Sequence, residues 1–166
     1  MLTQTQLKEV IHYEPGTGVL TWVKARPRVV PGTRAGSKHH TGYRYVTVLG
    51  HAYPEHHIAW LYMTGALPSA FLDHRNRVKD DNRWRNLREA SRKQNSENSL
   101  VRCDSVSGVR GVSWDSIEGK WRVYIYHNKK QLHLGYYKHK TKAARARREA
   151  EIRLFTHSPL RAYHVR

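Results

Sequence analysis

Only one cysteine, Cys103, occurs among the 166 residues. A single thiol excludes an internal disulfide and leaves no cysteine cluster of the kind that holds zinc in zinc ribbons. No apolar run comes near the roughly 20 residues that a membrane span requires, and residues 1–10 lack the pattern of a signal peptide. We therefore expect a cytoplasmic protein that is not secreted and has no membrane partner.

Acidic residues are also scarce, because 13 Asp and Glu stand against 30 Lys and Arg, for a formal net charge of +17. Residues 1–100 carry 15 basic and 8 acidic residues, and residues 101–166 carry 15 and 5. Five Trp and ten Tyr lie among these charges, so both halves are expected to fold. The charge favours a polyanionic partner, with nucleic acid the leading candidate, although ribosomal and histone-like proteins are basic without being enzymes.

The apolar pattern predicts an α+β protein in two parts. In the first part, helices are expected over residues 3–13, 56–64 and 91–98. Its expected strands are residues 19–23, 43–49, 70–74 and 87–90, with loops at 24–38 and 75–86. In the second part, strands over residues 110–114, 121–127 and 131–137 precede a helix over 141–155. This pattern predicts a three-stranded antiparallel sheet packed on one helix, after a linker at residues 100–107.

The pair Asp73-His74 ends a predicted strand and is followed by a polar loop, a strand and a helix. Hydrolysis of a phosphodiester needs a base that deprotonates water and positive charge near the phosphate. His74 is suited to be this base, since its ordinary pKa is about 6.5. Asp73 is a hard oxygen ligand for Mg²⁺ or Mn²⁺. The alternative is an ordinary polar pair at the end of a strand.

Residues 55–98 resemble the HNH endonucleases, particularly the free-standing homing-type enzymes of phages. The resemblance rests on HHIAW at residues 56–60, LDH at 72–74 and DNRWRNLR at 81–88. It implies a ββα-metal core within a nuclease domain of residues 1–100. It also implies cleavage of double-stranded DNA in a bacterial or phage-infected cell.

The resemblance implies roles for four residues. His74 matches the general base of the family, and Asn86, thirteen residues after Asp73, matches the central Asn that orients it. Asp73 and Asn95 match the ligands of one divalent cation, Mg²⁺ or Mn²⁺, with Asn where the third motif residue is otherwise His.

The residues alone leave alternatives to these assignments. Asn82 competes with Asn86 for the orienting role, and Asn98 competes with Asn95 as a ligand. Two loop arginines are candidate DNA contacts that could equally form a solvated face: Arg83 and Arg85.

The second part is expected to recognise DNA through its sheet. Strand alternation places Arg122, Tyr124 and Tyr126 on one face and Trp121 with Val123 on the other. A β-sheet can lie in the major groove and present alternate side chains to base edges. The face opposite the helix is therefore expected to contact DNA.

Residues 107–155 resemble the Apetala-type (AP-two, ethylene-response-factor) DNA-binding domain, through GVRGVSW at 108–114 and KWRVYI at 120–125. The candidate DNA contacts of this domain are Arg110, Trp114, Lys120, Trp121 and Arg122. For Trp121 the two predictions conflict. The resemblance implies a DNA contact, whereas strand alternation places the side chain on the core face unless a β-bulge reverses it. Residues 156–166 are expected to form a tail.

These observations together predict a metal-dependent DNA endonuclease, homing-type, that nicks DNA or cuts both strands as a monomer or a homodimer. The main alternative is a non-catalytic, sequence-specific DNA-binding regulator with a decayed nuclease domain. A structural RNA-binding protein is the third interpretation.

Overall fold

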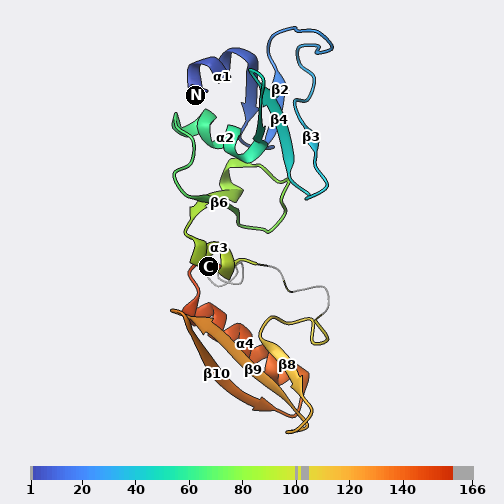
Figure 1. Ribbon diagram of the computed structural model, residues 1–166, viewed down its shortest axis with the longest axis vertical. Coiled ribbons are helices and arrows are strands. Elements are labelled where there is room, and N and C mark those ends of the chain that lie inside the picture. The colour runs from blue at the N-terminus through green and yellow to red at the C-terminus, as the bar shows by residue number, and fades with distance from the viewer. Residues whose placement is uncertain (1, 100, 102–104, 159–166) are drawn as a thin grey trace. The chain divides into compact units, whose positions relative to one another are not determined.

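The computed structural model describes residues 2–99, 101 and 105–158 (Figure 1). The chain forms two compact units, Met1–Arg92 and Lys93–Arg166, and each is considered by itself. The division falls before the linker predicted at residues 100–107. That linker and the predicted tail, residues 156–166, lie partly outside the described residues, and Cys103 lies wholly outside them.

The first unit combines helices with small antiparallel sheets, in agreement with the α+β class. Its helices are α1 (Gln4–Val10), α2 (Glu55–Thr64) and the short 3-10 helix η1 (Trp84–Asn86). Its strands are β1 (Ile11–Glu14), β2 (Val19–Trp22), β3 (Ser37–Lys38), β4 (Arg44–Val48), β5 (His51–Pro54), β6 (Phe71–His74) and β7 (Leu87–Ala90). The strands pair as β1–β2, β3–β4–β5 and β6–β7.

The helix predicted over residues 3–13 ends at Val10, so this prediction was too long. Ile11 is already extended, with φ −129° and ψ 134°, and β1 pairs with β2 in register from Ile11–Trp22 to Glu14–Val19. Ile11 and Tyr13 are buried while their neighbours are exposed, which is the period of a strand. Burial of alternate side chains against β2 outweighs the local helical pattern.

The other predicted elements of this half are confirmed within one or two residues. The loop predicted at residues 24–38 contains the short strand β3, and β5 is a strand that the pattern did not predict. The β6–β7 hairpin and the helix that follows in the chain give the predicted order of strand, loop, strand and helix. The ββα-metal packing of these elements stays a prediction.

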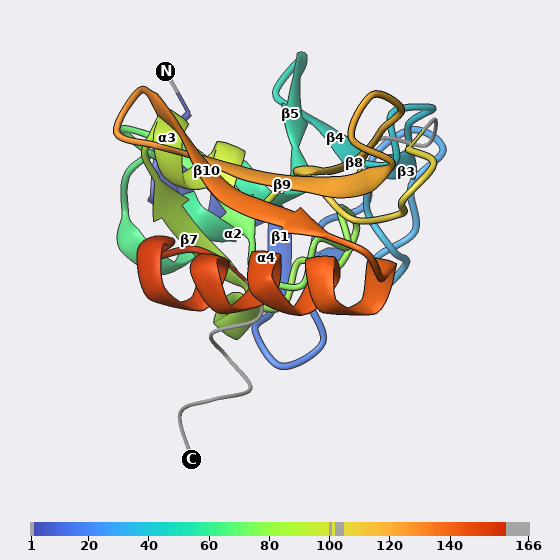
Figure 2. The ribbon, with the colours of Figure 1, turned by 90° about the horizontal axis from the view of Figure 1, so that it is seen from below.

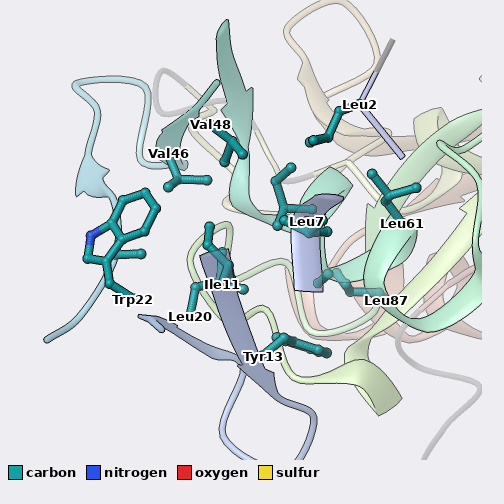
Figure 3. Packing of buried hydrophobic residues seen from close by; sticks show 13 residues of the cluster. Leu2, Leu7, Ile11, Tyr13, Leu20, Trp22, Val46, Val48, Leu61 and Leu87 are labelled. Atoms are coloured by element: carbon teal, nitrogen blue, oxygen red, sulfur yellow. The ribbon is translucent and has the colours of Figure 1, made fainter. Parts of the chain in front are cut away.

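Apolar side chains from α1, β1, β2, β4, α2 and β7 form the core of the first unit (Figure 3). Leu7, Ile11, Leu20 and Ile58 have no exposed surface, and burial of such a side chain contributes about 1.5–3 kcal/mol. Leu87 belongs to the same core and is the register partner of His74. The β6–β7 hairpin is thereby fixed to the core beside its Asp73-His74 pair.

The second unit contains the predicted sheet and helix. Its elements are α3 (Arg92–Glu97), β8 (Val112–Asp115), β9 (Lys120–His127), β10 (Lys130–Tyr137) and α4 (Lys140–Leu154). The strands form an antiparallel sheet in the order β10–β9–β8, and α4 runs along one of its faces (Figure 2). Within the described part of the chain, no helix is long and apolar enough to cross a membrane.

Helix α3 is fastened to the second unit by side-chain hydrogen bonds. The buried Glu97 carboxylate accepts from the backbone N–H groups of Thr156 (3.0 Å) and His157 (3.2 Å). Arg110 Nη1 donates to the carbonyl of Ser96 at 2.6 Å. These bonds explain why all of α3 after its first residue, Arg92, belongs to the second unit.

The turn between β1 and β2 touches the polar loop that follows β6. A Cβ atom at Gly18 would lie 2.4 Å from the backbone nitrogen of Arg83 and 2.5 Å from the carbonyl carbon of Asn82. Gly18 also has a φ of +76°, which side chains with a Cβ adopt at a cost of about 1–2 kcal/mol. Only glycine allows the loop to approach this closely.

Gly18→Ala is expected to destabilise the first unit by about 2–4 kcal/mol, because the backbone cost and the overpacking add. The matched control is Gly50→Ala, since Gly50 has a φ of +81° and a Cβ atom there would meet nothing within 4 Å. This control should cost only about 1–2 kcal/mol. Denaturant unfolding of both variants measures the difference, and equal losses would contradict the close approach.

Candidate functional site

Strand β6 ends with two buried polar residues, Asp73 and His74, which are 6% and 4% exposed. The register of the hairpin places Arg88 of β7 opposite Asp73. Arg88 donates from Nε (2.9 Å) and Nη2 (2.7 Å) to Oδ2 of Asp73. The hairpin therefore presents a paired carboxylate next to a buried imidazole, at the point where the chain enters the loop.

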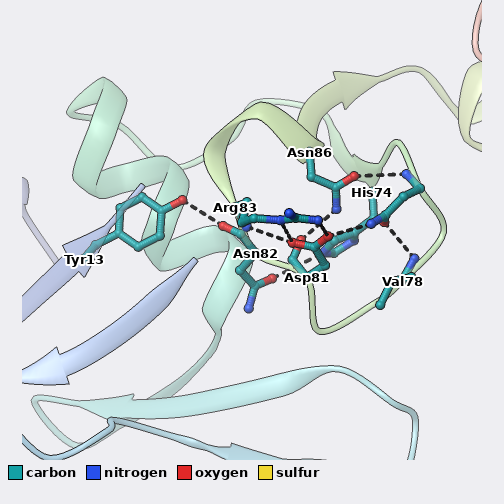
Figure 4. A network of polar contacts seen from close by, with 8 residues as sticks. Tyr13, His74, Val78, Asp81, Asn82, Arg83 and Asn86 are labelled. Carbon is teal, nitrogen blue, oxygen red and sulfur yellow. Dashed lines mark hydrogen bonds and ion pairs between the residues drawn. The ribbon is translucent and has the colours of Figure 1, made fainter. Parts of the chain in front are cut away.

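The His74 ring is oriented by Asn82, which is itself 1% exposed. His74 Nε2 lies 3.2 Å from Oδ1 of Asn82 (Figure 4). The loop folds back on itself and brings Asn82 to His74, the last residue of β6. A buried amide in this position restricts the ring to one orientation and favours one tautomer.

The structure differs here from the predicted role of Asn86. Both polar atoms of the Asn86 side chain bond within the loop: Oδ1 accepts from the Asn76 N–H at 3.0 Å, and Nδ2 donates to the Asp81 carbonyl at 2.7 Å (Figure 4). Asn86 holds the loop in shape, and Asn82 lies against His74. The spacing along the sequence could not decide between them, because the path of the loop determines which amide reaches the ring.

Sequence reasoning missed the residues that hold Asn82. Its Nδ2 donates to Glu55 Oε2 at 3.1 Å, and Glu55 Oε1 accepts from Arg44 Nε at 2.9 Å. The Tyr13 hydroxyl donates to the backbone carbonyl of Asn82 at 2.7 Å. These partners come from β1, β4 and α2, at separations that no local motif reveals.

Two aromatic rings enclose the His74 imidazole. The ring centres of His56 and Tyr43 lie 5.1 Å and 5.9 Å from that of His74. Burial lowers the pKa of His74, while the Asn82 hydrogen bond and Asp73 act in the opposite direction. The ring is therefore neutral and able to accept a proton near neutral pH.

His56 is a second buried imidazole. Burial, with smaller effects of His74 and His57, lowers the pKa of His56 to about 3. Its Nδ1 atom is buried and has no hydrogen-bond partner among the described residues. The His56 ring instead packs against the rings of Tyr43 and His74.

The loop after β6 is braced by a carboxylate. Asp81 accepts from Nε of Arg83 at 2.7 Å and from Nδ2 of Asn76 at 2.6 Å. Arg83, a predicted DNA contact, is thus engaged in an ion pair that shapes the loop. Arg85, the other predicted contact from this loop, is exposed on η1.

The donor atoms expected for a divalent cation divide between the units. Asp73 is buried in the first unit, and Asn95 is an exposed residue of α3 in the second. Among the described residues, no group of three or more His, Cys, Asp or Glu side chains could hold a metal ion. Carboxylate and amide oxygens fit Mg²⁺ or Mn²⁺ in type, and a cation on Asp73 would share that carboxylate with Arg88.

In the β10–β9–β8 sheet of the second unit, the face opposite α4 carries aromatic and basic side chains. By alternation and register, this face includes Lys120, Arg122, Tyr124, Tyr126 and Tyr136. Arg122 is exposed, and Tyr126 and Tyr136 are 58% and 41% exposed. This surface has the composition of a nucleic-acid interface, and we call it the open face.

Trp114 and Trp121 do not lie on the open face. Their pairing in β8–β9 is regular, without the bulge that would reverse Trp121. Trp121 packs against the cluster of Val112, Val123 and Ala143 beneath α4, and Trp114 contacts the Trp121 ring at 5.3 Å. The alternation of the strand, rather than the family resemblance, gave the correct face for Trp121.

Arg110 also differs from its predicted role, because its hydrogen bond to Ser96 ties α3 to the second unit. Lys120 is half-buried at the start of β9, with Glu118 3.8 Å from its ammonium group. Of the five candidate DNA contacts in this unit, Arg122 is the one that is both exposed and on the open face.

Comparison with known families supports an HNH nuclease domain. The sequence model of a family described as HNH endonuclease matches residues 53–97, which include α2, the β6–β7 hairpin, its loop and α3. No curated protein and no solved structure matches the chain. The match covers the Asp73-His74 pair and Asn82. It does not extend to the β10–β9–β8 sheet of the second unit.

Stability should depend on pH through His56. Its pKa is about 3 in the folded protein and 6.5 ordinarily, so between these values the unfolded chain binds a proton that the folded protein excludes. Stability is therefore lost as the pH falls below about 6.5, by up to about 1.4 kcal/mol per pH unit.

Urea unfolding of the wild type and of His56→Gln, from about pH 7 to about pH 4, measures this dependence. The variant should lose less stability than the wild type as the pH falls. If the free energy of unfolding fell equally with pH in both proteins, His56 would not be the source of the pH dependence. Both proteins contain the same carboxylates, so the contributions of those groups cancel in the comparison.

Proposed function

We propose that this protein is a metal-dependent DNA endonuclease of the HNH type, with a second unit that recognises DNA. The observation that carries the proposal is the buried, oriented His74 beside Asp73, inside the segment that matches the HNH family. The net charge of +17 supports a polyanionic substrate. The family match supports DNA as the substrate class, and the proposed substrate is double-stranded DNA.

In the proposed mechanism, His74 is the general base that removes a proton from the attacking water. Asn82 holds the ring in place and replaces Asn86 as the orienting residue. A bound Mg²⁺ or Mn²⁺ would neutralise charge on the phosphate and on the leaving 3′ oxygen. Asp73 and Asn95 are the proposed ligands of this cation, and Asn98 is the alternative to Asn95.

The open face of the second sheet is the proposed DNA-recognition surface. Arg122 is exposed there and has its guanidinium 5.9 Å from the Tyr124 ring centre. An arginine on a sheet can donate two hydrogen bonds to the edge of a guanine in the major groove. We propose a homing-type enzyme in which this unit supplies affinity and site preference, while a monomer nicks or a homodimer cuts both strands.

His74→Ala is expected to abolish cleavage and leave DNA binding nearly unchanged, because the base is lost while the basic surface is kept. Incubation of purified protein with supercoiled plasmid and Mg²⁺ or Mn²⁺ measures this, with EDTA to remove the metal. His51→Ala is the matched control, since His51 is exposed in the same unit, and it should cleave like the wild type. Wild-type protein that binds tightly but cleaves no DNA containing its site would favour the regulator instead.

Arg122→Ala is expected to weaken binding to duplex DNA by about tenfold, the loss of one good contact. Arg145→Ala removes the same charge from α4, where Arg145 is exposed and pairs with Glu149, and it should weaken binding less. Gel-shift titrations at one fixed salt concentration compare the two. Equal losses would mean that only net charge matters and that the open face does not bind DNA.

A further inference from the structure

Glu55 is a charged residue with no exposed surface, at the first position of α2. Its two oxygens have different partners, because Oε1 accepts from Arg44 and Oε2 accepts from Asn82. A guanidinium can only donate hydrogen bonds, so Arg44 keeps Oε1 in the role of acceptor. Paired with Arg44, Glu55 is an ionised carboxylate, which only accepts hydrogen bonds, so its Oε2 offers Asn82 only an acceptor.

This arrangement fixes which way the Asn82 amide points. An amide nitrogen only donates and an amide oxygen only accepts. Since Nδ2 of Asn82 faces the Glu55 carboxylate at 3.1 Å, Oδ1 is the atom that faces His74 Nε2 at 3.2 Å. The neutral His74 ring must then carry its proton on Nε2, and its lone pair lies on Nδ1.

Space for the Arg44–Glu55 pair is provided by Gly36. A Cβ atom there would lie 2.4 Å from Glu55 Oε1. The Gly36 carbonyl also accepts from Arg44 Nη2 at 3.0 Å, and the residue has a φ of +77°. Gly36, Arg44 and Asn82 thus converge on one buried carboxylate.

We infer that Glu55, held by Arg44, is a positioning residue that sets the tautomer of His74 through Asn82 and makes Nδ1 the proton-accepting atom. Only the catalytic consequence rests on the proposed function. In the proposed hydrolysis of the phosphodiester, His74 Nδ1 takes a proton from water and the water oxygen bonds to phosphorus. The bond from phosphorus to the leaving oxygen breaks, and that oxygen keeps the electron pair and takes a proton from solvent.

Glu55→Gln tests the inference with almost no change in shape. Arg44 can only donate, so the oxygen of the new glutamine must turn toward Arg44 and its NH₂ group toward Asn82. Asn82 must then turn its oxygen to residue 55 and its nitrogen to His74. The expected result is a reversed His74 tautomer, with the proton on Nδ1, and a cleavage rate about 10- to 100-fold lower at unchanged DNA affinity.

The tautomer is read directly by ¹⁵N NMR of protein labelled at histidine, in which protonated and unprotonated ring nitrogens have well-separated shifts. The His74 signals are those that disappear in His74→Gln, among twelve histidines. Glu89→Gln is the matched control, because Glu89 is exposed and bonds Ser69, and it should keep the wild-type tautomer and rate. If Glu55→Gln fails to fold, Asn82→Leu removes the acceptor and should give a mixture of both tautomers.

A wild-type His74 with its proton on Nδ1, or a folded Glu55→Gln that keeps it on Nε2, would overturn the inference. A wild-type tautomer in folded Asn82→Leu would do the same. If the tautomer reverses while the wild type cleaves no DNA, the positioning network is established and the proposed function fails separately.

Discussion

The first unit depends on the burial of one amide, Asn82. This residue belongs to an irregular loop, yet it is 1% exposed and its polar atoms bond to three different elements. Tyr13 of β1 holds its backbone, Glu55 of α2 holds its nitrogen, and His74 of β6 meets its oxygen. A buried amide without these partners would cost about 1–3 kcal/mol per unsatisfied group, so the loop, the helix and the hairpin must be in place together.

Local patterns in the sequence were sufficient for most elements and for the Asp73-His74 pair. Alternating and helical periods located β4, β7 and α4 within one or two residues, because burial of a single face dictates those patterns. They were insufficient for the partner of His74. Asn82 and Asn86 lie in one loop and have the same chemistry, and only the backbone path, set by the contact at Gly18, decides between them.

In the second unit, too, the sequence pattern predicted the placement of strand residues but not a contact made from a loop. Alternation along β9 correctly placed Arg122 and Trp121 on opposite faces, because a regular ladder leaves a strand no freedom to rotate one side chain. It could not reveal that Arg110 bonds the backbone of Ser96, since that contact joins a loop to a helix across fourteen residues. A basic residue near a basic surface is therefore a weak indication of a DNA contact until its hydrogen-bond partners are known.

The Arg44–Glu55 pair is an inefficient way to stabilise a protein. Burial raises the pKa of Glu55, and the Arg44 charge acts against that rise, as expected when desolvation and ion pairing compete. A buried ion pair contributes little net stability compared with well-packed apolar residues, whereas loss of one partner costs several kcal/mol. In this fold the pair fixes hydrogen-bond directions instead. Both oxygens of the Glu55 carboxylate can only accept, so rotating the group would still leave an acceptor facing Asn82. An apolar pair at these positions would fill the same space and leave the Asn82 amide, and hence the His74 ring, without a defined orientation.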